Sequence, residues 1–180
     1  YSDDFKNYTL CEAIDTHFSK FNIGPIVLIN VLDPSKHRKE VSNKSISQIN
    51  GMYLLEDTGI IADTVVITSS FEHTKKFNEK GQLLLIPKEE KSGAIQVSYS
   101  TLDPSAIKAK EIIGGIDGET GKKTGLEAVA DVFPKYRKVP SLLLAPKWST
   151  DSTVAAVIEA KARKINGHFQ AMGLVDLDTT

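Results

Sequence analysis

The chain has almost no cysteine, no long hydrophobic run and no excess of charge of either sign, and each absence excludes a class of protein. Cys11 is the only cysteine in 180 residues, which excludes an intramolecular disulfide and a cysteine-based zinc cluster. No apolar stretch approaches the ~18 residues of a membrane span, so we expect no membrane partner. The 22 basic and 23 acidic side chains give a net charge of -1, which predicts no general affinity for nucleic acid.

Motifs for nucleophilic catalysis are also missing. A triad needs a nucleophile, a base and an orienting acid. No histidine lies in a recognisable hydrolase context; the four are His17, His37, His73 and His168. No Gly-x-Ser-x-Gly segment occurs, so three candidate serines are interpreted as turn or strand-end residues: Ser100, Ser141 and Ser149. The sequence therefore predicts no catalytic residues and no enzyme activity.

The densest glycine stretch, Gly114–Thr124, suggests a phosphate-binding loop, because such loops point backbone amides at phosphate oxygens. The match fails at two positions. Ile116 stands where the first glycine is required, and Lys123 stands where a serine or threonine should follow the lysine. We interpret the stretch as a glycine-rich turn and predict no cofactor.

Metal ligands are equally sparse. No histidine pair has the i, i+4 spacing of a helical zinc site, and no acidic loop has the pattern of a calcium site. Asp176 and Asp178 follow a predicted strand, where carboxylates either serve a functional site or simply end the strand and cap the next helix. We favour the structural role, and predict no metal.

Hydrophobic periodicity predicts alternating helices and strands at both ends of the chain. Apolar residues recur at helical spacing over 9–21, 124–137 and 152–165. Continuous apolar runs typical of buried strands occur at 26–32, 139–145 and 169–177. This order predicts an α/β fold with a mostly parallel sheet flanked by helices.

Between these regions the pattern changes to short apolar segments separated by turn residues. Strands are expected at 52–55, 64–68, 82–86 and 94–99. We therefore predict a small antiparallel β insertion domain over 36–101, within a discontinuous α/β core domain made of 1–35 and 102–180. The tetrapeptide Leu-Asp-Pro-Ser occurs at both boundaries, at 32–35 and 102–105.

Two further features leave alternatives open. The chain begins at Tyr1 with no signal segment, so we expect a fragment or a processed product. Trp148 is interpreted equally well as an interface anchor or as part of the core.

Four segments together resemble the contractile tail sheath proteins of bacteriophages and of related prophage or bacteriocin particles. They are Asn30–Pro34, Ser98–Pro104, Ile112–Leu126 and Leu143–Ser149, the last leading to Ala160–Ala162 and to Val175–Leu177. The resemblance spans nearly the whole chain. Its most specific part is the glycine-rich stretch with Thr120-Gly121-Lys122 and the segment that follows.

This resemblance implies a structural subunit with a subtilisin-like topology and no protease activity. It implies hexameric rings stacked around a tail tube, contraction that drives the tube through a cell envelope, and contacts with the baseplate and the tail terminator. The location implied is the virion tail sheath, after assembly in the bacterial host cytoplasm. Insertion domains of this family commonly lie on the outside of the particle, which suits the polar residues 36–101.

Two other hypotheses remain at this stage. An α/β enzyme or binding domain would use Asp176 or the Gly114–Thr124 loop on a small phosphorylated ligand. Alternatively, the insertion would bind a carbohydrate or a receptor, as exposed β modules often do.

Overall fold

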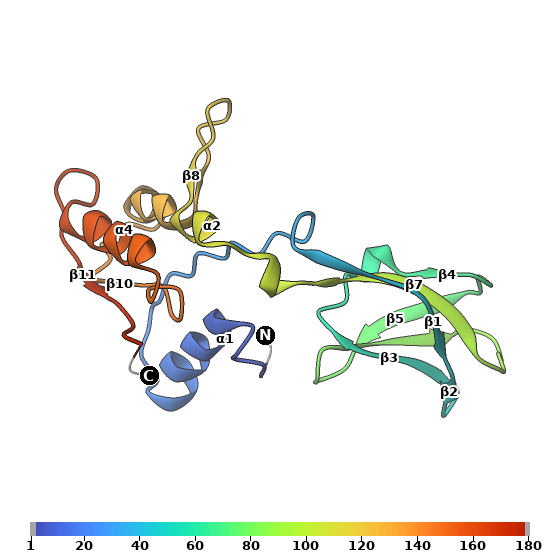
Figure 1. Cartoon of the computed structure of the whole chain (residues 1–180). Helices are drawn as coiled ribbons and strands as arrows, with labels where there is room; N and C mark the ends of the chain where they lie inside the picture. The colour runs from blue at the N-terminus through green and yellow to red at the C-terminus, as the bar shows by residue number, and fades with distance from the viewer. Residues whose placement is uncertain (1–2, 179–180) are drawn as a thin grey trace. The chain divides into compact units, whose positions relative to one another are not determined.

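The computed structural model describes residues 3–178, which divide into two compact units. The first, here called the β unit, comprises Asp33–Ala106. The second, here called the helical unit, comprises Asp3–Leu32 and residues 107–178 (Figure 1). Positions 1, 2, 179 and 180, which the sequence prediction assigned to the core domain, lie outside the described residues.

The β unit consists of two antiparallel sheets. One has the strand order β1 (Arg38–Ile46), β7 (Ile95–Leu102) and β4 (Val66–Ile67). The other has the order β2 (Gln48–Ile49), β3 (Met52–Thr58), β6 (Gln82–Pro87) and β5 (His73–Phe77). A short 3₁₀ helix, η2 (Ala62–Thr64), precedes β4. The strands expected at 52–55, 64–68, 82–86 and 94–99 are confirmed as β3, β4, β6 and β7.

The core of the β unit is formed by side chains that alternate between inward and outward positions along the strands. Every second residue of β3 and β6 points inward, since successive side chains of a strand face opposite sides. Four of these inward residues are completely buried: Tyr53, Leu55, Leu83 and Leu85. Asn50 and Gly51 both have positive φ, which is the requirement of the tight turn joining β2 to β3. The Asn-Gly pair therefore sets the register that brings the apolar faces together.

One edge of this core carries a polar network. The Tyr99 hydroxyl donates to Oδ2 of Asp57, and Lys44 Nζ lies 2.9 Å from the same oxygen. Pairing is irregular at both strands, between Val41 and Lys44 in β1 and between Leu55 and Thr58 in β3. Such irregularities re-aim side chains, which explains how a lysine and an aspartate reach a core tyrosine.

The network perturbs the pKa values of its members. The hydrogen bond from Tyr99 lowers the pKa of the Asp57 carboxyl, with Lys44 adding to the effect against the opposing cost of burial. Burial, followed by the hydrogen bond to Asp57, raises the pKa of Tyr99 to about 12. The folded state thus favours an ionised Asp57 beside a neutral Tyr99.

These shifts predict two limits to the stability of the β unit. Above pH ~10, where a free tyrosine ionises, the folded state keeps a proton that the unfolded chain loses, so stability falls as pH rises towards 12. In acid, stability falls as pH drops below ~3.9 and through the lower pKa of folded Asp57. Urea unfolding across pH should show both losses. Tyr99→Phe should reduce the loss of stability at high pH, and Asp57→Asn should reduce the loss of stability in acid. An unchanged pH dependence of the free energy of unfolding in either variant would contradict the role given to that residue.

The two Leu-Asp-Pro-Ser segments form matching turns at the ends of the β unit. Asp33 Oδ1 accepts from Ser35 N at 2.9 Å and from Ser35 Oγ at 2.7 Å. Asp103 Oδ1 accepts from the backbone and hydroxyl of Ser105 in the same way. His37 joins the turns, because its Nδ1 accepts from Asp33 N at 2.9 Å and its carbonyl accepts from Asp103 N at 2.8 Å. The chain therefore enters and leaves the β unit through one hydrogen-bonded stem, and the 3₁₀ turn η3 (Pro104–Ala106) overlaps the second of its two turns.

The helical unit begins with α1 (Thr9–Ile14), which continues as the π-helical turn η1 (Asp15–Lys20). After the β unit come α2 (Ala109–Ile113), β8 (Gly115–Ile116), β9 (Lys123–Thr124), the 3₁₀ segment η4 (Gly125–Asp131) and α3 (Val132–Tyr136). The unit ends with β10 (Leu142–Leu144), α4 (Ser152–Arg163) and β11 (Met172–Leu174). Its core lies between α4, η4 and β10, with Val154 and Ile158 completely buried.

Helix α4 agrees closely with the helix expected at 152–165. The Asp151 side chain caps it by accepting from the backbone N–H groups of Thr153 and Val154, at 2.8 and 3.2 Å. The helix ends at Arg163, and Asn166 and Gly167 adopt positive φ in the turn that follows it. The helix expected in this region is therefore confirmed.

The predicted mostly parallel sheet is wrong. Three of the four sheets formed by the described residues are antiparallel, and only β10 and β11 pair in parallel. Residues 26–32, expected as a buried strand, form no strand, and Val27 and Leu28 remain 45% and 42% exposed. An apolar run indicates a tendency to be buried, but a parallel strand also needs neighbouring strands and helices on both faces. The helix expected at 124–137 is instead the 3₁₀ segment η4 followed by α3.

Candidate functional site: the exposed surface of the helical unit

Exposed apolar side chains are concentrated in the helical unit. Among the described residues, fourteen large exposed hydrophobic side chains lie in this unit and three lie in the β unit. The three in the β unit are Ile49, Val66 and Phe77. Large exposed apolar surfaces on soluble proteins mark interaction sites. The contrast between the units therefore places the candidate site on the helical unit.

The β10–β11 sheet shows this exposure most clearly. Helix α4 packs against one face, where Leu143 is buried and a Cβ atom added at Gly173 would lie 2.9 Å from Ile158 Cγ2. Register pairs Leu142 with Met172 and Leu144 with Leu174, so these four side chains share the opposite face. They are between 39% and 64% exposed. A parallel sheet normally has both faces covered, and this one has much of one face open.

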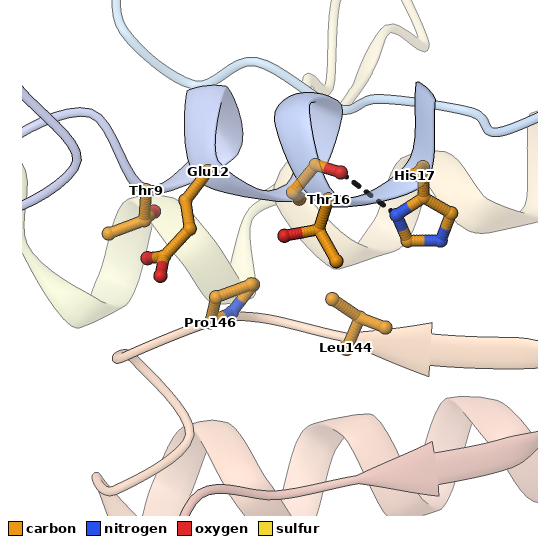
Figure 2. Close-up of a pocket in the computed structure, with 7 residues that line it drawn as sticks. Thr9, Glu12, Thr16, His17, Leu144 and Pro146 are labelled. Carbon is orange, nitrogen blue, oxygen red and sulfur yellow. Dashed lines mark hydrogen bonds between the residues drawn. The ribbon is translucent and has the colours of Figure 1, made fainter. Parts of the chain in front are cut away.

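A shallow groove lies between α1 and the end of β10 (Figure 2). The helix side is formed by Thr9, Glu12, Ala13, Thr16 and His17, and the strand side by Leu144 and Pro146. Its volume is about 240 Å³. His17 Nδ1 lies 2.8 Å from the Ala13 carbonyl oxygen, so this nitrogen is engaged within its own helix. The groove thus combines an apolar floor with a carboxylate at its rim.

Lys147 connects the groove to the segments around it. Its Nζ donates to the Phe5 carbonyl at 2.9 Å and lies 3.5 Å from Glu12 Oε2. Its backbone N–H donates to Asp176 Oδ2 at 2.6 Å, and the Ser149 hydroxyl donates to the same oxygen at 2.9 Å. Asp176 therefore joins the segments that follow β10 and β11. Asp176 is thus engaged with its own chain, through these hydrogen bonds and not through the cap of a following helix.

The glycine-rich stretch forms an antiparallel hairpin, here called the finger (Gly115–Thr124), that projects from the rest of the helical unit (Figure 1). At its tip, Asp117 Oδ1 accepts from the backbone N–H groups of Glu119 and Thr120, at 3.1 and 2.7 Å, and from the Thr120 hydroxyl at 2.7 Å. These hydrogen bonds, led by the one from the Thr120 backbone, lower the pKa of the Asp117 carboxyl. The chain's own carboxylate thus occupies amides that a phosphate would need, which argues against the phosphate-loop interpretation.

At the base of the finger, the backbone segments at Gly114 and Gly125 cross in close contact. A Cβ atom added at Gly114 would lie 1.8 Å from the Thr124 carbonyl oxygen, and one added at Gly125 would lie 2.4 Å from the Ile112 carbonyl oxygen. Both residues also have positive φ, at 76° and 54°. Lys123 Nζ, 2.6 Å from Asp131 Oδ1, ties the same base to the end of η4. The close backbone contact and the ion pair therefore hold the base of the finger against the rest of the helical unit.

The remaining candidate residues have structural positions. Trp148 is partly buried against the core of the helical unit, which supports the core interpretation. His73 Nδ1 lies 2.8 Å from the Phe71 carbonyl, and the His168 backbone N–H donates to Ile165 at the turn after α4. Ser100 lies in β7, and the backbone N–H of Met172 donates to the Ser141 carbonyl. Within residues 3–178, no three His, Cys, Asp or Glu side chains form a metal-binding group, and no helix is long and apolar enough to cross a membrane.

A shallow groove, an open sheet face and a projecting hairpin are typical of a protein that assembles with other chains. Comparisons with known proteins found two relatives. The chain is 26% identical over 167 residues to the "Tail sheath protein" of Burkholderia phage BcepMu, an alignment that covers 86% of this chain and 34% of that protein. It is 30% identical over 71 residues to a "Putative prophage major tail sheath protein" of Pseudomonas aeruginosa, covering 39% of this chain and 18% of that protein.

The resemblance to phage and prophage tail sheath proteins is therefore confirmed. The chain spans about a third of the length of the BcepMu protein and less of the P. aeruginosa protein. Both relatives are named as structural proteins of a phage or prophage tail sheath. No protein-family profile matches the chain, and no solved structure matches it.

Proposed function

We propose that the chain is part of a structural subunit of a contractile tail sheath. In this proposal the subunits polymerise as stacked hexameric rings around a tail tube and contract to drive the tube through a cell envelope. The partners are other copies of the subunit, the tube protein, the baseplate and the tail terminator. The subunit resides in the virion tail after assembly in the host cytoplasm.

The observation that carries this proposal is the exposed apolar surface of the helical unit, in a chain related to tail sheath proteins. Stable interfaces bury about 1,200–2,000 Å² in total and are apolar at their centres. The exposed face of β10–β11 offers such a centre. The β unit has few exposed apolar residues, which supports a position on the outer surface of the particle.

Electron microscopy of the full-length protein tests the proposal. Concentrated protein should form rings or tubes, because burial of the open sheet face favours association. As a variant, Leu144→Glu combined with Leu174→Glu places two charges on that face and should abolish the tubes. The matched control, Val66→Glu, changes an exposed apolar residue of the β unit and should leave them intact. A full-length protein that stays monomeric at high concentration would contradict the proposed role.

A further inference from the structure

Two Asn-Gly pairs lie in exposed turns that have nearly the same backbone. Asn50 and Gly51 have φ of 51° and 79°, and Asn166 and Gly167 have φ of 51° and 81°. All four residues are exposed. Asparagine before glycine is chemically labile, because glycine has no side chain to keep its backbone nitrogen away from the asparagine amide. The two pairs share this intrinsic chemistry, so a difference in their reactivity must come from the surrounding structure.

The side-chain amide of Asn166 is held in place, whereas that of Asn50 is not. Asn166 Nδ2 donates to the Ala130 carbonyl at 2.9 Å, which fixes the amide group against η4. Within residues 3–178, no hydrogen bond engages the side chain of Asn50, which lies at the tip of the β2–β3 hairpin (Figure 1). The Asn50 amide is therefore free to rotate towards the Gly51 nitrogen.

The backbone beside the two turns is also anchored differently. Ile165, directly before the second pair, is 3% exposed, and its carbonyl accepts from the Phe169 backbone N–H at 3.0 Å. Ile49, directly before the first pair, is 55% exposed and belongs to a strand of two residues at the edge of its sheet. Local opening costs least where few apolar contacts hold the backbone. The Asn50 turn therefore leaves its hairpin conformation more readily than the Asn166 turn.

We propose that Asn50 is a site of spontaneous deamidation in the folded protein, and that Asn166 is protected. The Gly51 nitrogen forms a bond to Asn50 Cγ, while its proton passes through base to the side-chain nitrogen, which leaves as ammonia. Water then opens the cyclic imide. Cleavage of the new bond at Cγ gives aspartate, and cleavage of the original peptide bond to Gly51 gives isoaspartate. Water is the one co-reactant that is consumed.

Both products change the turn between β2 and β3. Each replaces a neutral amide with a negatively charged carboxylate. Isoaspartate also adds a carbon atom to the backbone of a two-residue loop, which then no longer matches the pairing of Ile49 with Met52. We therefore expect the β unit of aged protein to unfold at lower denaturant concentration. This inference does not depend on the proposed sheath function.

Peptide mapping by mass spectrometry tests the proposal in unassembled full-length protein incubated at mildly alkaline pH. In the folded protein, the peptide carrying Asn50 should gain the mass of an amide-to-acid exchange at least severalfold faster than the peptide carrying Asn166. In urea, where the contact with Ala130 and both turns are lost, the two peptides should react at similar rates. Equal rates in the folded protein, or no reaction at Asn50 under conditions where the unfolded chain reacts, would overturn the proposal.

A pair of glycine variants tests the consequence for stability. Asn50→Gly removes the reactive side chain and keeps a residue that suits a positive φ. After ageing, this variant should keep the unfolding midpoint of its β unit, whereas the wild type should lose part of it. Asn166→Gly is the matched control and should age as the wild type does. A loss in aged Asn50→Gly equal to that of the wild type would contradict the link between Asn50 and the weakened hairpin.

Discussion

Gly125→Ala should destabilise the helical unit by about 3 kcal/mol or more. The residue has φ of +54°, and a Cβ atom would lie within 2.6 Å of the carbonyl oxygens of both Ile112 and Glu111. Left-handed strain costs of order 1–3 kcal/mol, and overpacking against backbone that cannot move aside adds about as much again. The measurement is chemical unfolding followed by circular dichroism, comparing variant and wild type at equal m-values.

The chain contains a matched control for this prediction. Gly118 lies at the tip of the same hairpin, where an added Cβ meets nothing within 4 Å and φ is not positive. Gly118→Ala should therefore change stability by no more than about 0.5 kcal/mol. Equal effects of the two substitutions would show that the crossing at the finger base is not the source of the constraint.

The second large effect is expected in the β unit, where Leu85→Ala should cost about 2–5 kcal/mol. Leu85 is completely buried in β6, opposite Tyr53 in β3. Truncation removes apolar burial and leaves a cavity that the two sheets cannot fully close. Val66→Ala, at a position 64% exposed in β4, is the control and should be close to neutral.

The same variant tests a proposal about domain organisation. We propose that the β unit folds independently, because its cluster of ten buried residues is separate from that of the helical unit. Leu85→Ala should then lower the unfolding transition of the β unit and leave that of the helical unit unchanged. A fragment of residues 33–106 should show the same loss of stability. One shared transition that shifts as a whole would contradict independence.

The sequence predicted those elements whose signals are local. Short apolar segments between turn residues were sufficient to predict β3, and apolar residues at helical spacing were sufficient to predict α4. Each of these depends on neighbours within a few residues, where propensity and hydrogen bonding decide the outcome. The network of Tyr99, Asp57 and Lys44 was missed, because strand irregularities bring together residues that are far apart in the sequence.

The prediction of a mostly parallel sheet failed for the opposite reason, because the pairing of strands depends on residues far apart in the sequence. The run at 26–32 has the composition of a buried strand, yet no strand pairs with it in the described residues. Gly114–Thr124 was interpreted as a glycine-rich turn, and the structure forms a two-stranded hairpin there. Its exposure and the crossing at its base were not predictable, because both depend on how α2 and η4 meet. The density of glycines in this stretch was the one feature of the sequence that pointed to an unusual backbone there.

The stem formed by His37 and the two Asp-Pro-Ser turns has a consequence for engineering and for evolution. The carbonyl of His37 accepts from Asp103 N at 2.8 Å, so the chain leaves the β unit beside the point where it entered. A segment with adjacent ends can be shortened, replaced or exchanged for foreign cargo without changing the spacing of the flanking chain. Grafting at Asp33 and Asp103 would use a junction that the protein already closes with its own hydrogen bonds.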